Sequence, residues 1–258
     1  MSSIYQHFRK DEKEFVDAVL QWKQSVRDQY APMLTDFLDP RQQFIVQSLI
    51  GGQDDINLHF YPFESSIERR RAVICPDYFV PQEEDFKVKT YEIDYPVKFV
   101  TIQHPEVLGS LMSIGLKREK FGDIIKNDSR VQLYLAEEIS EYVKMELQQI
   151  GKTKIKLKQI LKSDRISSEE VWNEKTTTVS SLRLDVLLSS IYNISRQKAQ
   201  ALINGGVVKV NWKLVENTSF ELQEGDVISA RGYGRSKVLA VEGRTKKEKW
   251  RISVGVLK

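Results

Sequence analysis

The sequence has few of the residues and patterns that mark secreted, metal-binding or membrane proteins. Its 258 residues include one cysteine, Cys75, which excludes an intramolecular disulfide and indicates a reducing compartment, so we expect a cytoplasmic protein. The three histidines, His7, His59 and His104, do not have the spacing of metal ligands, and we expect neither a metal nor another cofactor. No apolar run approaches the ~20 residues of a membrane-spanning helix, and the first residues lack the apolar core of a signal peptide, so we expect no membrane partner.

Charge is distributed unevenly along the chain. The net charge is +3, but residues 180–258 contain 14 Lys/Arg and 7 Asp/Glu, which gives +7, whereas residues 1–179 contain 25 and 29, which gives −4. A basic C-terminal part on a mildly acidic body indicates a polyanionic partner that is bound mainly at that end.

Residues 183–230 predict two short helices followed by a small sheet. Apolar residues at i, i+3, i+4 and i+7 predict one face of the first helix: Leu184, Leu187, Leu188 and Ile191. Ser195 lies where the N-cap of a second helix is expected, and Gly205 and Gly206 end that helix. Apolar runs at 207–210 and 226–230 are typical of strands.

Basic residues lie at the start of both predicted helices. Arg183 opens the first, and Arg196 and Lys198 lie in the first turn of the second. Cations at a helix N-terminus oppose the helix dipole, so helix stability does not explain them. Phosphate reverses the sign of the interaction, and the N–H groups of a helix N-terminus also bind phosphate. The pattern therefore favours a phosphate-containing partner.

The same stretch resembles the RNA-binding domain named after small-subunit ribosomal protein four, here called the S-four domain. The matching residues are Arg183, Leu184, Asp185, Ser195, Arg196, Ile203, Gly206, Val208, Val210, Asn211, Gly225, Asp226, Arg231 and Gly232. The resemblance implies that the two-helix face and nearby loops bind structured RNA. The RNA-binding residues expected from it are Arg183, Ser195, Arg196 and Lys198, supported by Lys209, Arg231 and Arg235.

One position departs from the S-four pattern. The family usually has Asn-Gly at the hairpin turn, whereas Trp212 follows Asn211 here. Since a type I′ turn needs positive φ at both central residues, we expect an altered or wider turn.

The rest of the chain predicts an α+β protein. Residues 1–75 are expected to form a helical N-terminal subdomain with a β-hairpin. Residues 76–162 are expected to form a ferredoxin-like, RRM-like domain with the order β-α-β-β-α-β. Residues 163–180 are polar and predict a linker to an S-four domain at 181–258 that ends in a β-hairpin.

Further basic clusters lie before the predicted linker. Arg69, Arg70 and Arg71 are interpreted as a solvated strand start, with an RNA contact as the alternative. A second RNA-binding face is considered in the middle domain, at a basic loop and along the last strand: Lys117, Arg118, Lys120, Lys154, Lys156 and Lys158. Lysines on an edge strand also protect it against aggregation, which is the competing interpretation.

The whole chain resembles the YlmH family of bacterial S-four proteins. The residues that carry this resemblance are Leu108 to Met112 and Gly115 to Asp123, followed by the S-four stretch. Membership would imply a non-catalytic protein that binds ribosomal RNA and tRNA. It would act on the large ribosomal subunit that carries peptidyl-tRNA, in ribosome-associated quality control. The family is encoded near cell-division genes.

Two alternatives remain at this point. An RNA-modifying enzyme would use residues 1–160 for catalysis, but a pseudouridine synthase needs an aspartate in its own catalytic domain, and Asp185 lies in the S-four stretch. A methyltransferase needs a glycine-rich turn after a strand, whereas Gly51 and Gly52 end a helix. A scaffold linked to cell division would use the N-terminal helices as a protein interface.

Overall fold

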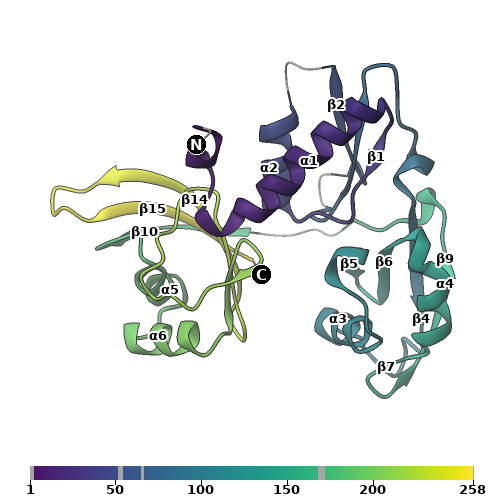
Figure 1. Ribbon diagram of the computed structural model, residues 1–258. Helices are drawn as coiled ribbons and strands as arrows, with labels where there is room; N and C mark the ends of the chain where they lie inside the picture. Colours follow the sequence, from purple (N-terminus) through teal and green to yellow (C-terminus); the bar gives the residue numbers. More distant parts are fainter. Residues whose placement is uncertain (1–2, 52–54, 65–66, 168–171, 258) are drawn as a thin grey trace. The chain divides into compact units, whose positions relative to one another are not determined.

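The computed structural model describes residues 3–51, 55–64, 67–167 and 172–257. The chain divides into two compact units, residues 1–168 and residues 169–258 (Figure 1). No helix within the described ranges has the length and apolar character needed to cross a membrane.

The first unit begins with two helices that cover a small antiparallel sheet (Figure 1). Its elements are η1 (Ser3–His7), η2 (Lys10–Glu12), α1 (Lys13–Gln29), β1 (Met33–Leu34), α2 (Pro40–Ile50), β2 (Ile56–Tyr61) and β3 (Arg71–Pro76), with the strand order β1-β3-β2. The side chain of Asp39 accepts a hydrogen bond from the N–H of Gln42 at 2.8 Å, and Pro40 occupies the first turn, so α2 begins where its sequence predicts.

The middle of the chain has the predicted ferredoxin-like arrangement. Its elements are η3 (Glu83–Phe86), β4 (Val88–Asp94), α3 (His104–Ser113), η4 (Arg118–Lys120), β5 (Phe121–Asn127), β6 (Arg130–Ala136), α4 (Glu137–Glu146), β7 (Gln149–Ile150), β8 (Thr153–Lys154), β9 (Lys156–Gln159) and η5 (Lys162–Asp164). The main sheet has the antiparallel order β5-β6-β4-β9, and apolar residues of α3 and α4 bury one of its faces.

The N-terminal part covers the other face of this sheet. Gly122 of β5 lets the Phe37 ring approach, since a Cβ at Gly122 would lie 2.8 Å from a Phe37 ring carbon and 3.0 Å from Cβ of Tyr134. Ile67 belongs to the same buried cluster. The carboxylate of Asp123 accepts hydrogen bonds from the backbone N–H groups of residues 68 and 69 at 2.5 and 3.3 Å. The predicted domain boundary after residue 75 therefore falls inside β3 and inside one unit.

The lysine-rich run at 152–158 is divided between two strands instead of forming one. Ile155 is buried, and its N–H donates to the carbonyl of Gln148 at 2.9 Å, which turns the chain between β8 and β9. β8 pairs with β7 in a separate two-stranded sheet, and β9 forms the edge of the main sheet beside β4.

The second unit places two helices on one face of a six-stranded antiparallel sheet (Figure 1). Its elements are β10 (Trp172–Val179), α5 (Leu184–Tyr192), α6 (Arg196–Asn204), β11 (Val208–Val210), β12 (Lys213–Leu214), β13 (Val227–Ala230), β14 (Gly234–Arg244) and β15 (Trp250–Leu257), with the order β10-β15-β14-β13-β11-β12. The predicted apolar stripe of α5 packs onto inward-facing valines and isoleucines of this sheet.

The predicted linker at 163–180 is wrong over its second half. Residues 172–179 form β10, which pairs along its full length with β15, while 168–171 lie outside the described residues. The side chains of β10 are mostly polar and exposed, so the strand depends on backbone pairing and shows no apolar alternation.

The turn at Asn211 and Trp212 keeps the two-residue geometry that its sequence does not predict. Val210 pairs with Lys213, and both central residues have positive φ, 48° and 66°. The buried amide of Asn211 donates to Asp226 at 2.8 Å and accepts from the N–H of Val227 at 3.0 Å. These bonds hold the left-handed turn and allow a bulky residue where glycine is usual.

Candidate nucleic-acid interface

A buried carboxylate lies where the N-terminal ends of α5 and α6 meet. The loop at 217–222 holds the start of α5, because the N–H of Leu184 donates to the carbonyl of Phe220 at 2.8 Å. Asp185, in the first turn, has no exposed surface. Its carboxylate accepts from Arg183 at 3.1 and 3.2 Å, from Arg196 at 2.9 Å and from Gln200 at 2.8 Å. One buried side chain thereby orients two arginines from different helices.

The electrostatics of this cluster keep Asp185 ionised. Burial raises the pKa of Asp185, but hydrogen bonds from Arg183, Gln200 and Arg196 outweigh burial and lower the pKa from 3.8 to about 2. The arginines remain accessible, with side chains 35% and 53% exposed. Arg196 contacts the carboxylate through Nε, and within the described residues its Nη groups have no partner. These groups have the fork geometry that binds phosphate oxygens.

Lys198 lies on the other side of the first turn of α6. The hydroxyl of Ser195 accepts from the N–H of Lys198 at 3.1 Å, which is the predicted N-cap. The ammonium of Lys198 lies 5.8 Å from the centre of the Tyr233 ring, which in turn packs on Tyr192 with ring centres 5.3 Å apart. The start of α6 is thus flanked by Arg196 toward α5 and by Lys198 toward the β13–β14 turn.

The structure does not bring all the predicted RNA-binding residues together. Arg231 is exposed in the β13–β14 turn beside Tyr233, and its N–H donates to the carbonyl of Val207 at 3.0 Å. Lys209 and Arg235 both pair with Ser229 in the sheet, one from each side, on the face opposite the helices. Arg183, Ser195, Arg196 and Lys198 therefore form one surface, the helix face, and Lys209 and Arg235 belong to another.

Comparisons with known proteins place this chain in a family. Residues 81–164 match the family described as "Putative RNA-binding domain in YlmH", and residues 182–228 match the S4 domain, the S-four domain of this article. The chain is 47% identical to "Ribosome-associated protein quality control protein P2" of Bacillus subtilis (strain 168). The alignment spans 254 residues and covers 98% of each chain. The chain belongs to the YlmH family. The "Cell division protein ylmH from Streptococcus pneumoniae" is a solved structure that matches with a TM-score of 0.56 and 30% identity, over 63% of this chain and 99% of that one.

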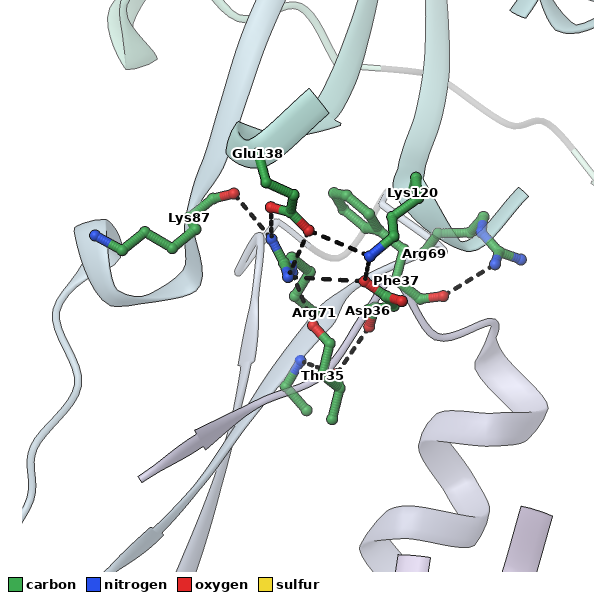
Figure 2. Close-up of polar contacts among 9 residues, drawn as sticks. Thr35, Asp36, Phe37, Arg69, Arg71, Lys87, Lys120 and Glu138 are labelled. Atoms are coloured by element: carbon green, nitrogen blue, oxygen red, sulfur yellow. Dashed lines mark hydrogen bonds and ion pairs between the residues drawn. The ribbon is translucent and has the colours of Figure 1, made fainter. Parts of the chain in front are cut away.

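In this YlmH protein, Arg118 and Lys120 of the proposed second RNA face have intramolecular partners. Arg118 donates to the carbonyls of Phe121 at 2.6 Å and Gly122 at 3.0 Å and stacks on the Phe121 ring. Burial, followed by the nearby charge of Arg69, lowers the pKa of Arg118. Lys120 pairs with Asp36 at 2.7 Å and with Glu138 at 3.4 Å (Figure 2). These contacts indicate that Arg118 and Lys120 stabilise the first unit, whereas Lys117 is exposed.

The interpretation of residues 69–71 as a solvated strand start is wrong for Arg69 and Arg71, which are buried (Figure 2). Arg71 donates to the carbonyls of residues 35 and 87 at 2.8 and 3.1 Å and to the carboxylate of Glu138 at 3.1 Å. Arg69 donates to the carbonyl of Phe37 at 3.0 Å. Its burial could not be read from the sequence, since the partners come from distant segments.

The sheet of the YlmH middle domain is closed on the side that RRM-type proteins use for stacking RNA bases. Phe37 and Ile67 cover it at one end. At the other end the side chain of Gln132 donates to the carbonyl of Asp164 at 2.9 Å and accepts from the N–H of Ile166 at 3.0 Å. The lysines of β8 and β9 remain exposed at the edge, and Lys158 pairs with Asp94 at 2.9 Å. RNA contact by Lys154, Lys156 and Lys158 stays a prediction.

Within the described residues, no group of three or more His, Cys, Asp or Glu side chains converges in a way that could hold a metal ion.

Proposed function

We propose that this YlmH protein is a non-catalytic RNA-binding protein that binds ribosomal RNA and tRNA. Its target is the large ribosomal subunit that carries peptidyl-tRNA, and its role lies in ribosome-associated quality control. The observation that carries the proposal is the buried carboxylate of Asp185, which orients Arg183 and Arg196 at the joined ends of α5 and α6. The printed name of the Bacillus subtilis relative supports the ribosomal role.

The charge and geometry of this surface support RNA binding. The guanidinium groups of Arg183 and Arg196 present N–H donors to phosphate oxygens, and the N-terminal N–H groups of α6 add partial positive charge. Lys198 supplies a further cation beside an aromatic ring. Phosphate contacts release counterions and supply affinity, while the shape of the RNA and its ribose hydroxyls supply selectivity.

A catalytic role for Asp185 has little support from its surroundings. Its two oxygens accept bonds from three side chains, and the residue has no exposed surface. A nucleophilic aspartate must instead present an oxygen to its substrate. Both family matches are RNA-binding domains, which favours binding over modification.

Sedimentation of ribosomes from cell lysate at two salt concentrations tests the proposal. Wild-type protein should sediment with large subunits, and Arg183→Ala/Arg196→Ala should stay at the top of the gradient. A plot of log K for binding against log salt concentration has a negative slope, and each lost phosphate contact should make it less steep by roughly 0.7–0.9. Lys246→Ala/Lys247→Ala removes the same charge from the exposed β14–β15 turn and serves as the control. If wild-type protein does not sediment with ribosomal particles, the proposal fails.

A second candidate is a protein interface related to cell division, favoured by the printed name of the Streptococcus pneumoniae structure. Exposed apolar side chains on α3 and α4, Met112, Tyr142 and Met145, are available for such a contact. Binding to a division protein that survives nuclease treatment and deletion of the S-four unit would support it.

A further inference from the structure

The strand register places a row of basic residues on the face of the S-four sheet opposite the helices, here called the outer face. Lys209 of β11 pairs with Ser229 of β13, and Ser229 pairs with Arg235 of β14. Directly paired residues point to the same side of a sheet. Their neighbours Val208, Ala230 and Ser236 are buried toward the helices, so Lys209, Ser229 and Arg235 point away from them.

Two more cations extend this row. Lys237 lies two residues along β14 and pairs with Gly255, and Arg251 of β15 pairs with Gly243. Among the described residues, Lys209, Lys237 and Arg251 have no ion-pair partner. At the paired outward positions that the structure describes, Glu174 on β10 is the one carboxylate. The outer face, formed by Lys209, Ser229, Arg235, Lys237 and Arg251, is therefore strongly basic.

The other outward positions carry both hydroxyl and apolar side chains. Ser229, Ser253, Thr176 and Thr178 have short hydroxyl side chains. Leu214 and Trp172 are apolar, and Trp172 lies over Gly255, since a Cβ there would be 3.2 Å from its ring. The hydroxyl groups can donate hydrogen bonds to phosphate oxygens. The row of cations together with these hydroxyl groups matches the anionic sugar–phosphate backbone of RNA.

We propose that the outer face is a second RNA-binding surface, so that the S-four unit binds two RNA segments at once. One segment contacts Arg183, Arg196 and Lys198 on the helix face, and the other contacts Lys209, Arg235 and Lys237. The apolar core of the unit separates the two faces, so one straight RNA segment cannot reach both. The inference rests on the proposed function, because it assumes that the helix face binds RNA.

Footprinting on large ribosomal subunits that carry peptidyl-tRNA tests this arrangement. Hydroxyl-radical cleavage is mapped on both ribosomal RNA and tRNA, with full-length protein added. Wild-type protein should protect two separate segments. Lys209→Gln/Arg235→Gln/Lys237→Gln should lose one protected segment, and Arg183→Ala/Arg196→Ala should lose the other. The loss of three phosphate contacts should make the slope of log K against log salt concentration less steep by roughly 2–3.

Matched variants separate a lost contact from lost charge or lost folding. Lys246→Gln/Lys247→Gln/Lys249→Gln removes the same charge from the β14–β15 turn, and it should retain both protected segments. Lys209→Arg/Lys237→Arg keeps the charge and should also retain both. If the triple outer-face variant keeps both segments and the wild-type salt slope, the second surface is refuted while the proposed function stands. If wild-type protein protects no segment, both fail.

Discussion

Replacing Asp185 by asparagine removes the charge that organises the helix face while leaving the shape of the side chain almost unchanged. The pKa of Asp185 falls from 3.8 to about 2 in the folded protein. A difference of this size corresponds to about 2.5 kcal/mol of stability at neutral pH. Arg196 is half-exposed, and solvent screening reduces this figure, so we expect Asp185→Asn to cost about 1–2 kcal/mol.

The stabilisation of the folded protein by Asp185 depends on pH. Because the pKa of Asp185 is lower in the folded than in the unfolded protein, its stabilising effect is complete above about pH 4. It is lost as the pH falls from about 4 toward 2. Asp185→Asn has no such group, so the difference in unfolding free energy between wild type and variant should be largest at neutral pH and should shrink over that range.

Urea unfolding followed by tryptophan fluorescence measures this difference in unfolding free energy within the S-four unit. Trp172, Trp212 and Trp250, three of the four tryptophans, lie in the S-four unit. With a typical denaturant slope, 1–2 kcal/mol lowers the midpoint by roughly 0.5–1 M urea. Glu242→Gln neutralises an exposed carboxylate of the same unit and is the control. Equal midpoints for wild type and Asp185→Asn at pH 7, or a difference that persists at pH 2, would refute the reasoning.

The structure makes further predictions about stability. Arg71→Met removes the buried guanidinium that binds the carbonyls of residues 35 and 87 and the carboxylate of Glu138, and it should destabilise the first unit by about 1–3 kcal/mol, measured as a lower thermal midpoint. Gly122→Ala places a Cβ 2.8 Å from the Phe37 ring and should cost about 1–3 kcal/mol in the same assay. Gly109→Ala has open space on α3 and should instead stabilise by up to about 1 kcal/mol, so equal effects of the two changes would contradict the packing described here. Asn211→Ala removes two bonds that hold the β11–β12 turn and should cost about 1–3 kcal/mol in urea unfolding.

The features that the sequence predicts correctly depend on nearby residues. The helix α5 follows from apolar spacing, and the start of α6 follows from the Ser195 N-cap. β10 has no such local signal, since it is a strand only because β15, more than seventy positions later, pairs with it. The turn at Asn211 was expected to change because Trp212 replaces glycine, but Asp226, fifteen residues away, holds the turn in place.

The same distinction applies to the candidate site. Arg183 and Arg196 could be predicted from their places at two helix starts, and the buried Asp185 that joins them lies in the same motif. Separating Lys209 and Arg235 from that surface requires the strand register, which the sequence does not contain. Likewise, Arg71 looks like a surface cation until its partners at residues 35, 87 and 138 are known.

The closed face of the middle sheet bears on how this family should be dissected experimentally. Residues 81–164 are recognised as a domain from sequence, but the side chains that close their sheet, Phe37 and Ile67, lie outside that range. A fragment cut at the recognised limits would present Ile125 and Tyr134 to water. Any nucleic-acid or protein binding measured with that fragment could involve a sheet face that is buried in the whole protein. The family match covers residues 81–164, but a fragment with an intact middle sheet must also include the N-terminal part that contains Phe37 and Ile67.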